Sequence, residues 1–194
     1  MQKPLLVMAL KSEGQGLLEP LGFEVLYSGV GKVNAAYHLT RRLHQASVHA
    51  RDFPYVLNLG SAGSPSFKSG SLVGADRFVQ RDMDATGLGF AHGQTPFDSH
   101  PPLITFPQIF EHLPHGVCGS GDSFLQGAPP IPSDIIDMEA YALAKICLQE
   151  SISFACIKYI TDGADGAASK DWQKNLVHAA QAFVQLLREL AASK

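Results

Sequence analysis

The sequence predicts an α/β layered fold, because apolar segments typical of strands alternate with longer segments of helical periodicity. The clearest strand covers residues 154–160. The clearest helix covers residues 172–190, where apolar side chains recur every three or four positions. The chain has 194 residues, of which 45% are hydrophobic, and this is enough for one sizeable core. We therefore expect a single domain over residues 1–194.

The first part of the chain predicts the beginning of the sheet and a covering helix. Residues 5–9 and 23–27 are short apolar segments of strand type. Helical spacing predicts a helix over residues 33–48. Residues 55–59 are apolar on both faces, which is typical of a central parallel strand. The small residues at 60–63 are predicted to break this strand in a tight turn.

The second part predicts a further strand, a long loop and another helix. Residues 72–80 have the pattern of a strand. Residues 82–114 are rich in Gly, Pro, His and Phe, without a sustained period, and are too long for an ordinary connection. A turn is expected at 120–122 and an amphipathic helix at 138–148.

Charge and cysteine usage exclude several classes of partner. A net charge of −3 provides no broad cationic surface for nucleic acid or an anionic membrane. The apolar run at residues 4–10 is too short to span a membrane and lacks a small-residue cleavage site. The three cysteines have no CxxC spacing, which favours a reducing compartment. We expect a cytoplasmic protein.

Acidic residues at the predicted ends of elements are the first candidates for a site. Asp162 follows the strand at 154–160, and the carboxyl ends of strands in α/β folds face the crevice where ligands bind. Asp137 and Glu139 lie where the helix at 138–148 begins, so free backbone N–H groups are expected to hold them.

These acids occur together with three segments rich in small residues, at 28–36, 58–63 and 120–124. The set resembles the purine nucleosidase and nucleoside phosphorylase family, and is most similar to the methylthioadenosine/S-adenosylhomocysteine nucleosidases. The resemblance extends over most of residues 9–165. It implies a nucleoside phosphorylase-like, three-layer α/β/α sandwich with a mixed central sheet. It also implies a purine nucleoside N-ribosyl hydrolase that uses no cofactor and no metal.

The resemblance implies a separate role for each of three acids. Asp162 would protonate or hydrogen-bond N7 of the leaving purine, and its carboxyl group can also accept from a 6-amino group. Glu139 would accept hydrogen bonds from the ribose 2′- and 3′-hydroxyls. Glu13, which follows the first strand, would activate the water that attacks C1′. Lys11 and Ser12 replace the acidic neighbours usual in the family.

Other residues would complete the nucleoside site. Phe124 would stack on the purine while backbone groups of Leu125 read its Watson–Crick edge. Lys158 stands where the nucleosidases usually carry an arginine, and it keeps the charge but not the forked geometry. The full set of further substrate-binding candidates is Ser61, Ala62, Gly63, Phe124, Leu125, Asp137, Met138, Glu139 and Lys158.

The segment at residues 81–97 is similar to a stretch that forms the dimer interface in this family. There it contributes apolar side chains to the 5′-substituent pocket of the neighbouring subunit. The resemblance therefore implies a homodimer, with Phe90, His92 and Phe97 in the partner subunit's pocket.

Alternative functions remain open on the sequence. A phosphorylase must clamp a phosphate, usually with arginines, but no arginine precedes Arg41 and none lies at 57–59, so water is the favoured acceptor. A non-catalytic nucleoside sensor would fit Lys158 and the altered surroundings of Glu13. An esterase interpretation of Gly-Asp-Ser-Phe at 121–124 lacks the N-terminal position and the late Asp-x-x-His of that group.

Overall fold

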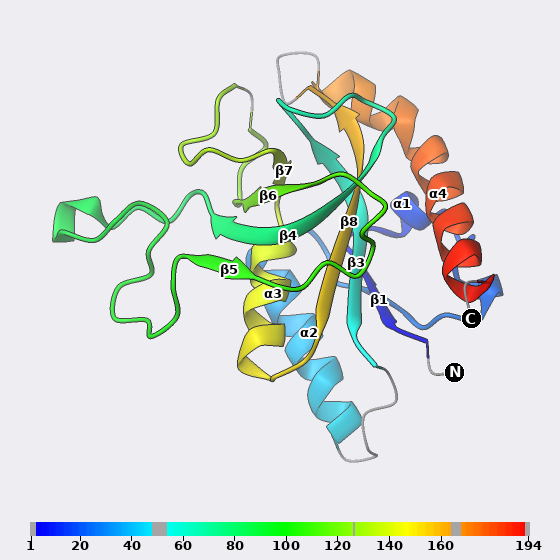
Figure 1. Ribbon diagram of the computed structural model, residues 1–194, viewed down its shortest axis with the longest axis horizontal. Helices are drawn as coiled ribbons and strands as arrows, with labels where there is room; N and C mark the ends of the chain where they lie inside the picture. The colour runs from blue at the N-terminus through cyan, green and yellow to red at the C-terminus, as the bar shows by residue number, and fades with distance from the viewer. Residues whose placement is uncertain (1–2, 48–53, 126, 164–167, 193–194) are drawn as a thin grey trace.

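The computed structural model describes residues 3–47, 54–125, 127–163 and 168–192, and within these it is a mixed sheet with helices on both faces (Figure 1). The predicted three-layer α/β/α architecture is confirmed. The strands are β1 (Leu5–Met8), β2 (Val25–Tyr27), β3 (Val56–Gly63), β4 (Leu72–Gln80), β5 (Leu103–Thr105), β6 (His115–Ser120), β7 (Ile135–Asp137) and β8 (Phe154–Asp162). The α-helices are α1 (Lys11–Gly14), α2 (Lys32–Ser47), α3 (Ala140–Gln149) and α4 (Ala168–Ala192), and 3₁₀ turns occur at Glu19–Leu21 and Thr86–Leu88.

Strand β1 shows how the sequence builds two cores. Leu5 and Val7 belong to the hydrophobic cluster that contains residues of α2 and α3. Leu6 and Met8 belong to a second cluster, which contains Phe183 and other residues of α4. Successive side chains of a strand point to opposite faces, so an uninterrupted apolar run produces a sheet buried on both sides.

Five strands of the sheet pair in a closed circuit. β3 is parallel to β8, β8 is antiparallel to β4, and β4 is parallel to β6. β6 is parallel to β7, and β7 returns to β3 through an antiparallel pair between Gly63 and Ile136. Gly63 is also paired with Asp162 of β8, with a register shift between Ala62 and Gly63. The carboxyl ends of β3, β7 and β8 are thereby brought together.

Several predicted boundaries are wrong. The small residues at 60–63 do not form a turn, because β3 continues to Gly63 with its backbone paired to β8. Residues 135–137 form the unpredicted strand β7, and α3 begins at Ala140, with Glu139 as its N-cap residue. Strand pairing outweighs the weak strand preference of glycine and serine at 60–63, and β7 is too short to show a period.

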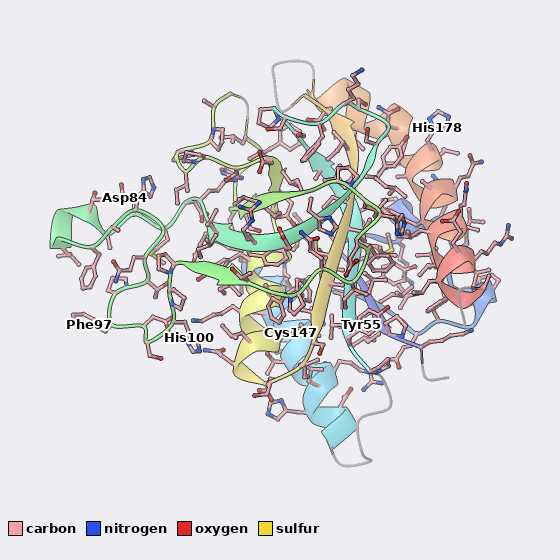
Figure 2. All side chains as sticks on the ribbon, viewed as in Figure 1. Tyr55, Asp84, Phe97, His100, Cys147 and His178 are labelled. Atoms are coloured by element: carbon pink, nitrogen blue, oxygen red, sulfur yellow. The ribbon has the colours of Figure 1, made fainter. Side chains whose placement is uncertain are left out.

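The predicted loop at 82–114 contains the short strand β5, which pairs antiparallel with β4. Between β4 and β5 the chain projects away from the sheet as an arm, residues 83–102 (Figure 1). Phe97 and Asp84 lie on this arm (Figure 2). Over the ranges that the structure describes, no helix has the length and apolar character needed to cross a membrane.

Candidate functional site

A cavity of about 250 Å³ lies where the carboxyl ends of β3, β7 and β8 meet. Its walls come from seven separate stretches of chain. They are Ala9, Leu10, Glu13, Val30, Ser61, Ala62, Gly63, Arg81, Ser123, Phe124, Leu125, Ile136, Asp137, Met138, Glu139, Thr161 and Asp162. The carboxylates of Glu13, Glu139 and Asp162, far apart in sequence, therefore line one space.

Glu13 is held against the end of β3. Two residues separate its helix, α1, from the end of β1, and only 4% of Glu13 is exposed. Oε1 accepts hydrogen bonds from the Ser61 backbone N–H at 2.8 Å and from the Ser61 hydroxyl at 2.7 Å. Oε2 accepts from the Leu10 backbone N–H at 3.1 Å. These bonds fix the carboxylate in one orientation at the cavity wall.

Asp162 is the last residue of β8 and is also buried. Its Oδ2 accepts a hydrogen bond from the Thr161 hydroxyl at 2.8 Å. The same hydroxyl is 3.2 Å from the Ala62 carbonyl oxygen of the neighbouring strand. The pairing of β8 with β3 thus fixes the position of the Asp162 carboxyl group in the cavity wall.

Glu139 lies at the start of α3 and accepts a hydrogen bond from the Gly31 backbone N–H at 2.8 Å. Burial, followed by the charge of the nearby Asp137 carboxylate, raises the pKa of Glu139 to about 7. Its charge therefore changes near neutral pH, which is unusual for a glutamate.

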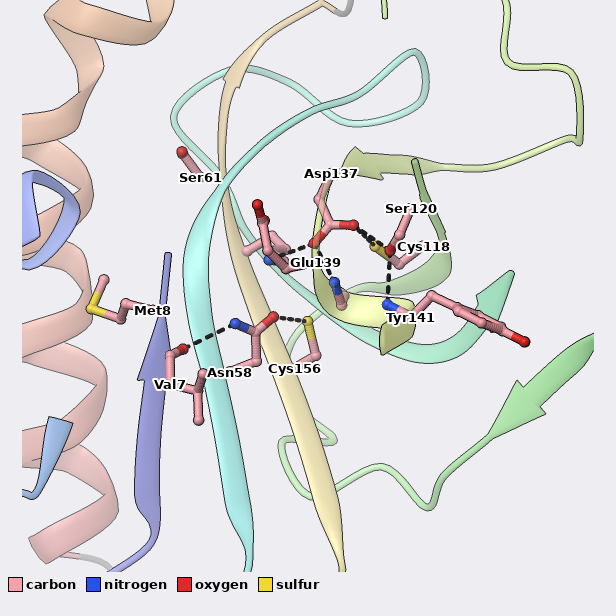
Figure 3. Close-up of polar contacts among 12 residues, drawn as sticks. Val7, Met8, Asn58, Ser61, Cys118, Ser120, Asp137, Glu139, Tyr141 and Cys156 are labelled. Carbon is pink, nitrogen blue, oxygen red and sulfur yellow. Dashed lines mark hydrogen bonds and ion pairs between the residues drawn. The ribbon is translucent and has the colours of Figure 1, made fainter. Parts of the chain in front are cut away.

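Asp137 is paired with Lys158 behind the cavity. Lys158 Nζ lies 2.8 Å from Asp137 Oδ2, which also accepts from the Ala140 backbone N–H at 2.8 Å. The Ser120 hydroxyl donates to the other oxygen (Figure 3). Burial alone would raise the pKa of Asp137, but the Lys158 ammonium and the Ser120 hydroxyl hold it below its ordinary value. Lys158 is 1% exposed and does not line the cavity.

The aromatic candidates separate into two groups. Phe124, 53% exposed, and Leu125 line the cavity from the loop that follows β6. Phe90, His92 and Phe97 lie on the arm and do not line it.

Seven further lining residues were not among the sequence candidates: Ala9, Leu10, Val30, Arg81, Ser123, Ile136 and Thr161. Arg81 directly follows β4, and Val30 precedes α2. The position of Arg81 at the end of a predicted strand is the same signal that identified Asp162, so the strand-end rule applied consistently would have found it. Val30 lies within residues 28–36, one of the segments that carry the family resemblance.

Comparison with known proteins identifies the family. The model of the family described as "Phosphorylase superfamily" matches residues 24–192. The chain belongs to the phosphorylase superfamily. The 5'-methylthioadenosine/S-adenosylhomocysteine nucleosidase of Baumannia cicadellinicola subsp. Homalodisca coagulata is 32% identical to this chain over 173 residues. These residues cover 79% of this chain and 73% of that protein. The family resemblance drawn from the motifs is confirmed.

Solved structures of the superfamily share the fold. The 5'-methylthioadenosine/S-adenosylhomocysteine nucleosidase from Neisseria meningitidis, in complex with methylthio-immucillin-A, has a TM-score of 0.85 at 23% identity, covering 100% of each chain. The futalosine hydrolase of Helicobacter pylori strain 26695 has a TM-score of 0.84 at 22% identity, covering 100% of this chain and 98% of the other. At such identities the likeness concerns the nucleoside phosphorylase-like fold alone.

Proposed function

We propose that this protein is a purine nucleoside N-ribosyl hydrolase that cleaves 5'-methylthioadenosine, S-adenosylhomocysteine or a related adenine nucleoside with water. The observation that carries the proposal is the convergence of Glu13, Glu139 and Asp162 on one cavity. Glycosidic cleavage needs a base for water, a hold on the ribose and a proton for the leaving group. Three separately positioned acids match these three tasks.

In the proposed reaction, Glu13 accepts a proton from water as the water oxygen bonds to C1′ of the ribose. The bond from C1′ to N9 breaks, and its electron pair goes to the purine. Asp162 donates a proton at N7, so adenine leaves neutral. Ser61 holds the Glu13 carboxylate through two hydrogen bonds and leaves it facing the cavity. Neutralising the departing base is the main electrostatic task of this site.

Substrate binding uses the remaining walls of the cavity. Glu139 binds the ribose 2′- and 3′-hydroxyls, and Met138 packs on the apolar face of the sugar. Phe124 stacks on the purine, with the Leu125 backbone at its edge. Asp162 accepts from the 6-amino group while donating to N7, which favours adenine over a 6-oxopurine.

The charges around the cavity favour water over phosphate as the acceptor. Arg81 is the one cationic side chain among the described residues that line it, and its guanidinium donates to Ser123 and Gly121. A dianionic phosphate would also approach the Glu13 carboxylate, which repels it. Hydrolysis needs no cation to bind a phosphate and brings no second anion near Glu13.

Adenine release from methylthioadenosine, measured with and without phosphate, tests the proposal. We expect turnover in phosphate-free buffer and no increase when phosphate is added. Turnover that requires phosphate would identify a phosphorylase, and tight nucleoside binding without turnover would identify a sensor. A panel of 5′-modified nucleosides, assayed in the same way, identifies the preferred substituent.

The pH profile of kcat/KM tests the role of Glu139. We expect kcat/KM to rise with pH through about 7, because only the carboxylate form accepts from both ribose hydroxyls. Glu139→Gln should lower kcat/KM and remove this inflection. If the inflection persists in Glu139→Gln, another group is responsible and the assignment is wrong.

The Glu139 carboxyl group should make stability fall with rising pH, although it makes kcat/KM rise. Native Glu139 keeps its proton up to about pH 7, whereas the unfolded chain releases it near the ordinary value of 4.5. Its contribution to the free energy of unfolding is therefore present below pH 4.5 and is lost as pH rises to about 7. Binding and stability should thus respond to pH in opposite directions at this residue.

We propose that the protein works as a homodimer in which the arm completes the partner's cavity. Leu88 and Phe97 on the arm are 75% and 93% exposed, respectively. The rings of Phe90 and Phe97 are in edge contact, with centroids 5.4 Å apart. Apolar side chains grouped on a projecting segment are typical of a protein–protein contact. Phe90, His92 and Phe97 would form a wall around the 5′-substituent.

Replacing Phe97 by asparagine tests the dimer. Phe97 has a φ of 61°, a conformation that asparagine tolerates, so the backbone should be retained. We expect a shift toward monomer in sedimentation velocity and a higher KM for nucleosides with apolar 5′-substituents. Val177→Asn on α4, where the native side chain is 47% exposed, is the matched control and should change neither. A Phe97→Asn protein that stays dimeric with an unchanged KM would contradict the proposal.

We further propose a single domain over residues 1–194 and a cytoplasmic location. Cys118, Cys147 and Cys156 are buried free thiols, which suits a reducing compartment. No cofactor, nucleic acid or membrane takes part in the proposed reaction.

A further inference from the structure

Within the described residues, every hydrogen bond of the Arg81 side chain goes to the loop that carries Phe124, the aromatic wall of the cavity. It is 1% exposed and directly follows β4. Nη1 donates to the Ser123 hydroxyl at 3.1 Å, and Nη2 donates to the carbonyl oxygens of Gly121 at 3.2 Å and Ser123 at 2.5 Å. Nε has no acceptor within the described residues. The guanidinium is thus devoted to residues 121–123.

Asp82 binds the same loop from the next position in the chain. Its Oδ2 accepts a hydrogen bond from the Asp122 backbone N–H at 2.8 Å, and its Oδ1 accepts from Lys32 Nζ at 2.5 Å. Lys32 in turn donates its backbone N–H to Asp122 Oδ1 at 2.7 Å. Three successive residues of the loop are therefore fixed by side chains of two successive residues after β4.

These contacts require a glycine at position 121. A Cβ atom placed on Gly121 would lie 2.8 Å from Cζ of Arg81 and 3.0 Å from Cγ of Asp82. Glycine at this position lets the guanidinium lie directly against the backbone. Phe124 follows the fixed residues immediately, with half of its surface exposed at the cavity.

We propose that Arg81, supported by Asp82, is a positioning residue that sets the place of Phe124 and Leu125 against the nucleobase. The inference rests on the proposed nucleosidase function and assigns the base-binding wall a dedicated support. The strength of stacking depends on the offset between the Phe124 ring and the nucleobase. Because Phe124 lies on an irregular loop, other residues must hold it in place. Hydrogen bonds from a charged guanidinium to backbone carbonyls are strong enough to supply it.

Arg81→Met removes the donors and keeps a long apolar stem. We expect the inhibition constant of adenine and the KM for methylthioadenosine to rise by about tenfold, because the variant weakens base stacking of the kind measured per base in other proteins. The kcat should change far less, since stacking is equal in the ground and transition states. Arg42→Met is the matched control, because Arg42 pairs with Glu24 on the surface, away from the cavity.

Hydrogen–deuterium exchange gives a readout that does not need activity. Amides at 121–125 should exchange faster in Arg81→Met than in the wild type or Arg42→Met. If the wild type releases no adenine, the proposed function fails. The exchange result still shows whether Arg81 holds residues 121–125 in place. Unchanged exchange and unchanged adenine affinity in Arg81→Met would overturn the inference.

Gly121→Ala provides an independent variant that keeps the arginine and displaces its guanidinium. We expect the same rise in KM, and a smaller additional rise when Gly121→Ala is combined with Arg81→Met, because both act through one contact. Full additivity would contradict the inference. If Arg81→Met does not fold, Gly121→Ala and Ser123→Ala, which removes the acceptor of Nη1, carry the same test.

Discussion

Asparagine in place of Asp162 is expected to slow adenine release by about 10²- to 10⁴-fold, the usual contribution of a positioned general acid. The amide cannot donate an acidic proton to N7, so the purine would have to leave as an anion. Its oxygen can still accept the hydrogen bond that the Thr161 hydroxyl gives to Asp162 at 2.8 Å. The fold should therefore remain intact, and the loss should appear mainly in kcat.

The matched control is Asp76→Asn, the same change on β4. Asp76 accepts from Gln108 and Arg77 and does not line the cavity, so adenine release should remain near the wild-type rate. Steady-state kinetics, combined with urea unfolding of each variant, separates chemistry from stability. A near-normal kcat in Asp162→Asn would show that the acid is a different group.

Removing the Lys158 ammonium is expected to have the largest effect on stability. Lys158→Met leaves the Asp137 carboxylate buried without its cation, and breaking a buried ion pair in this way costs about 3–5 kcal/mol. Urea unfolding should show the loss as a lower midpoint. Because the loss arises from an unpaired charge, it should shrink at low pH, where Asp137 takes up a proton.

A second variant tests whether charge or shape is responsible. Asp137→Asn combined with Lys158→Met removes both charges and keeps similar volumes, so it should recover much of the lost stability. The surface control Arg42→Met breaks the exposed pair with Glu24 and should cost less than about 1 kcal/mol. If Lys158→Met lowers the free energy of unfolding no more than Arg42→Met does, the pair of Asp137 and Lys158 has no special structural role.

The layers and two of the three acids, Asp162 and Glu139, are predictable because local patterns encode them. Largely apolar runs such as residues 154–160, in which Lys158 is the one charged residue, identify strands that are buried on both faces. Asp162 ends one of these strands, and the strand-end rule places it at a crevice without any knowledge of its neighbours. Glu13 required the family resemblance, since a glutamate shortly after a first strand has no distinctive local signal.

Features that depend on contacts between distant segments are not predictable in this way. The small residues at 60–63 suggest a turn, and only their pairing with β8 makes them a strand. The sequence predicts Lys158 as a substrate-binding cation, and its ion pair with Asp137 becomes visible only when β7 and β8 are placed in the fold. The arm at residues 83–102 has no sequence period, so no local pattern predicts that Leu88 and Phe97 are exposed on it.

In the proposed hydrolase, the closed circuit of β3, β8, β4, β6 and β7 fixes the position of Asp162 independently of the segments that would set specificity. Gly63 is paired on one side with Ile136 and on the other with Asp162, so main-chain pairing sets the spacing around the reacting bond. Phe124 and the arm, by contrast, belong to connecting segments outside the circuit. In this proposal, nucleoside specificity can change through those connecting segments while the strand pairing that places Asp162 is kept.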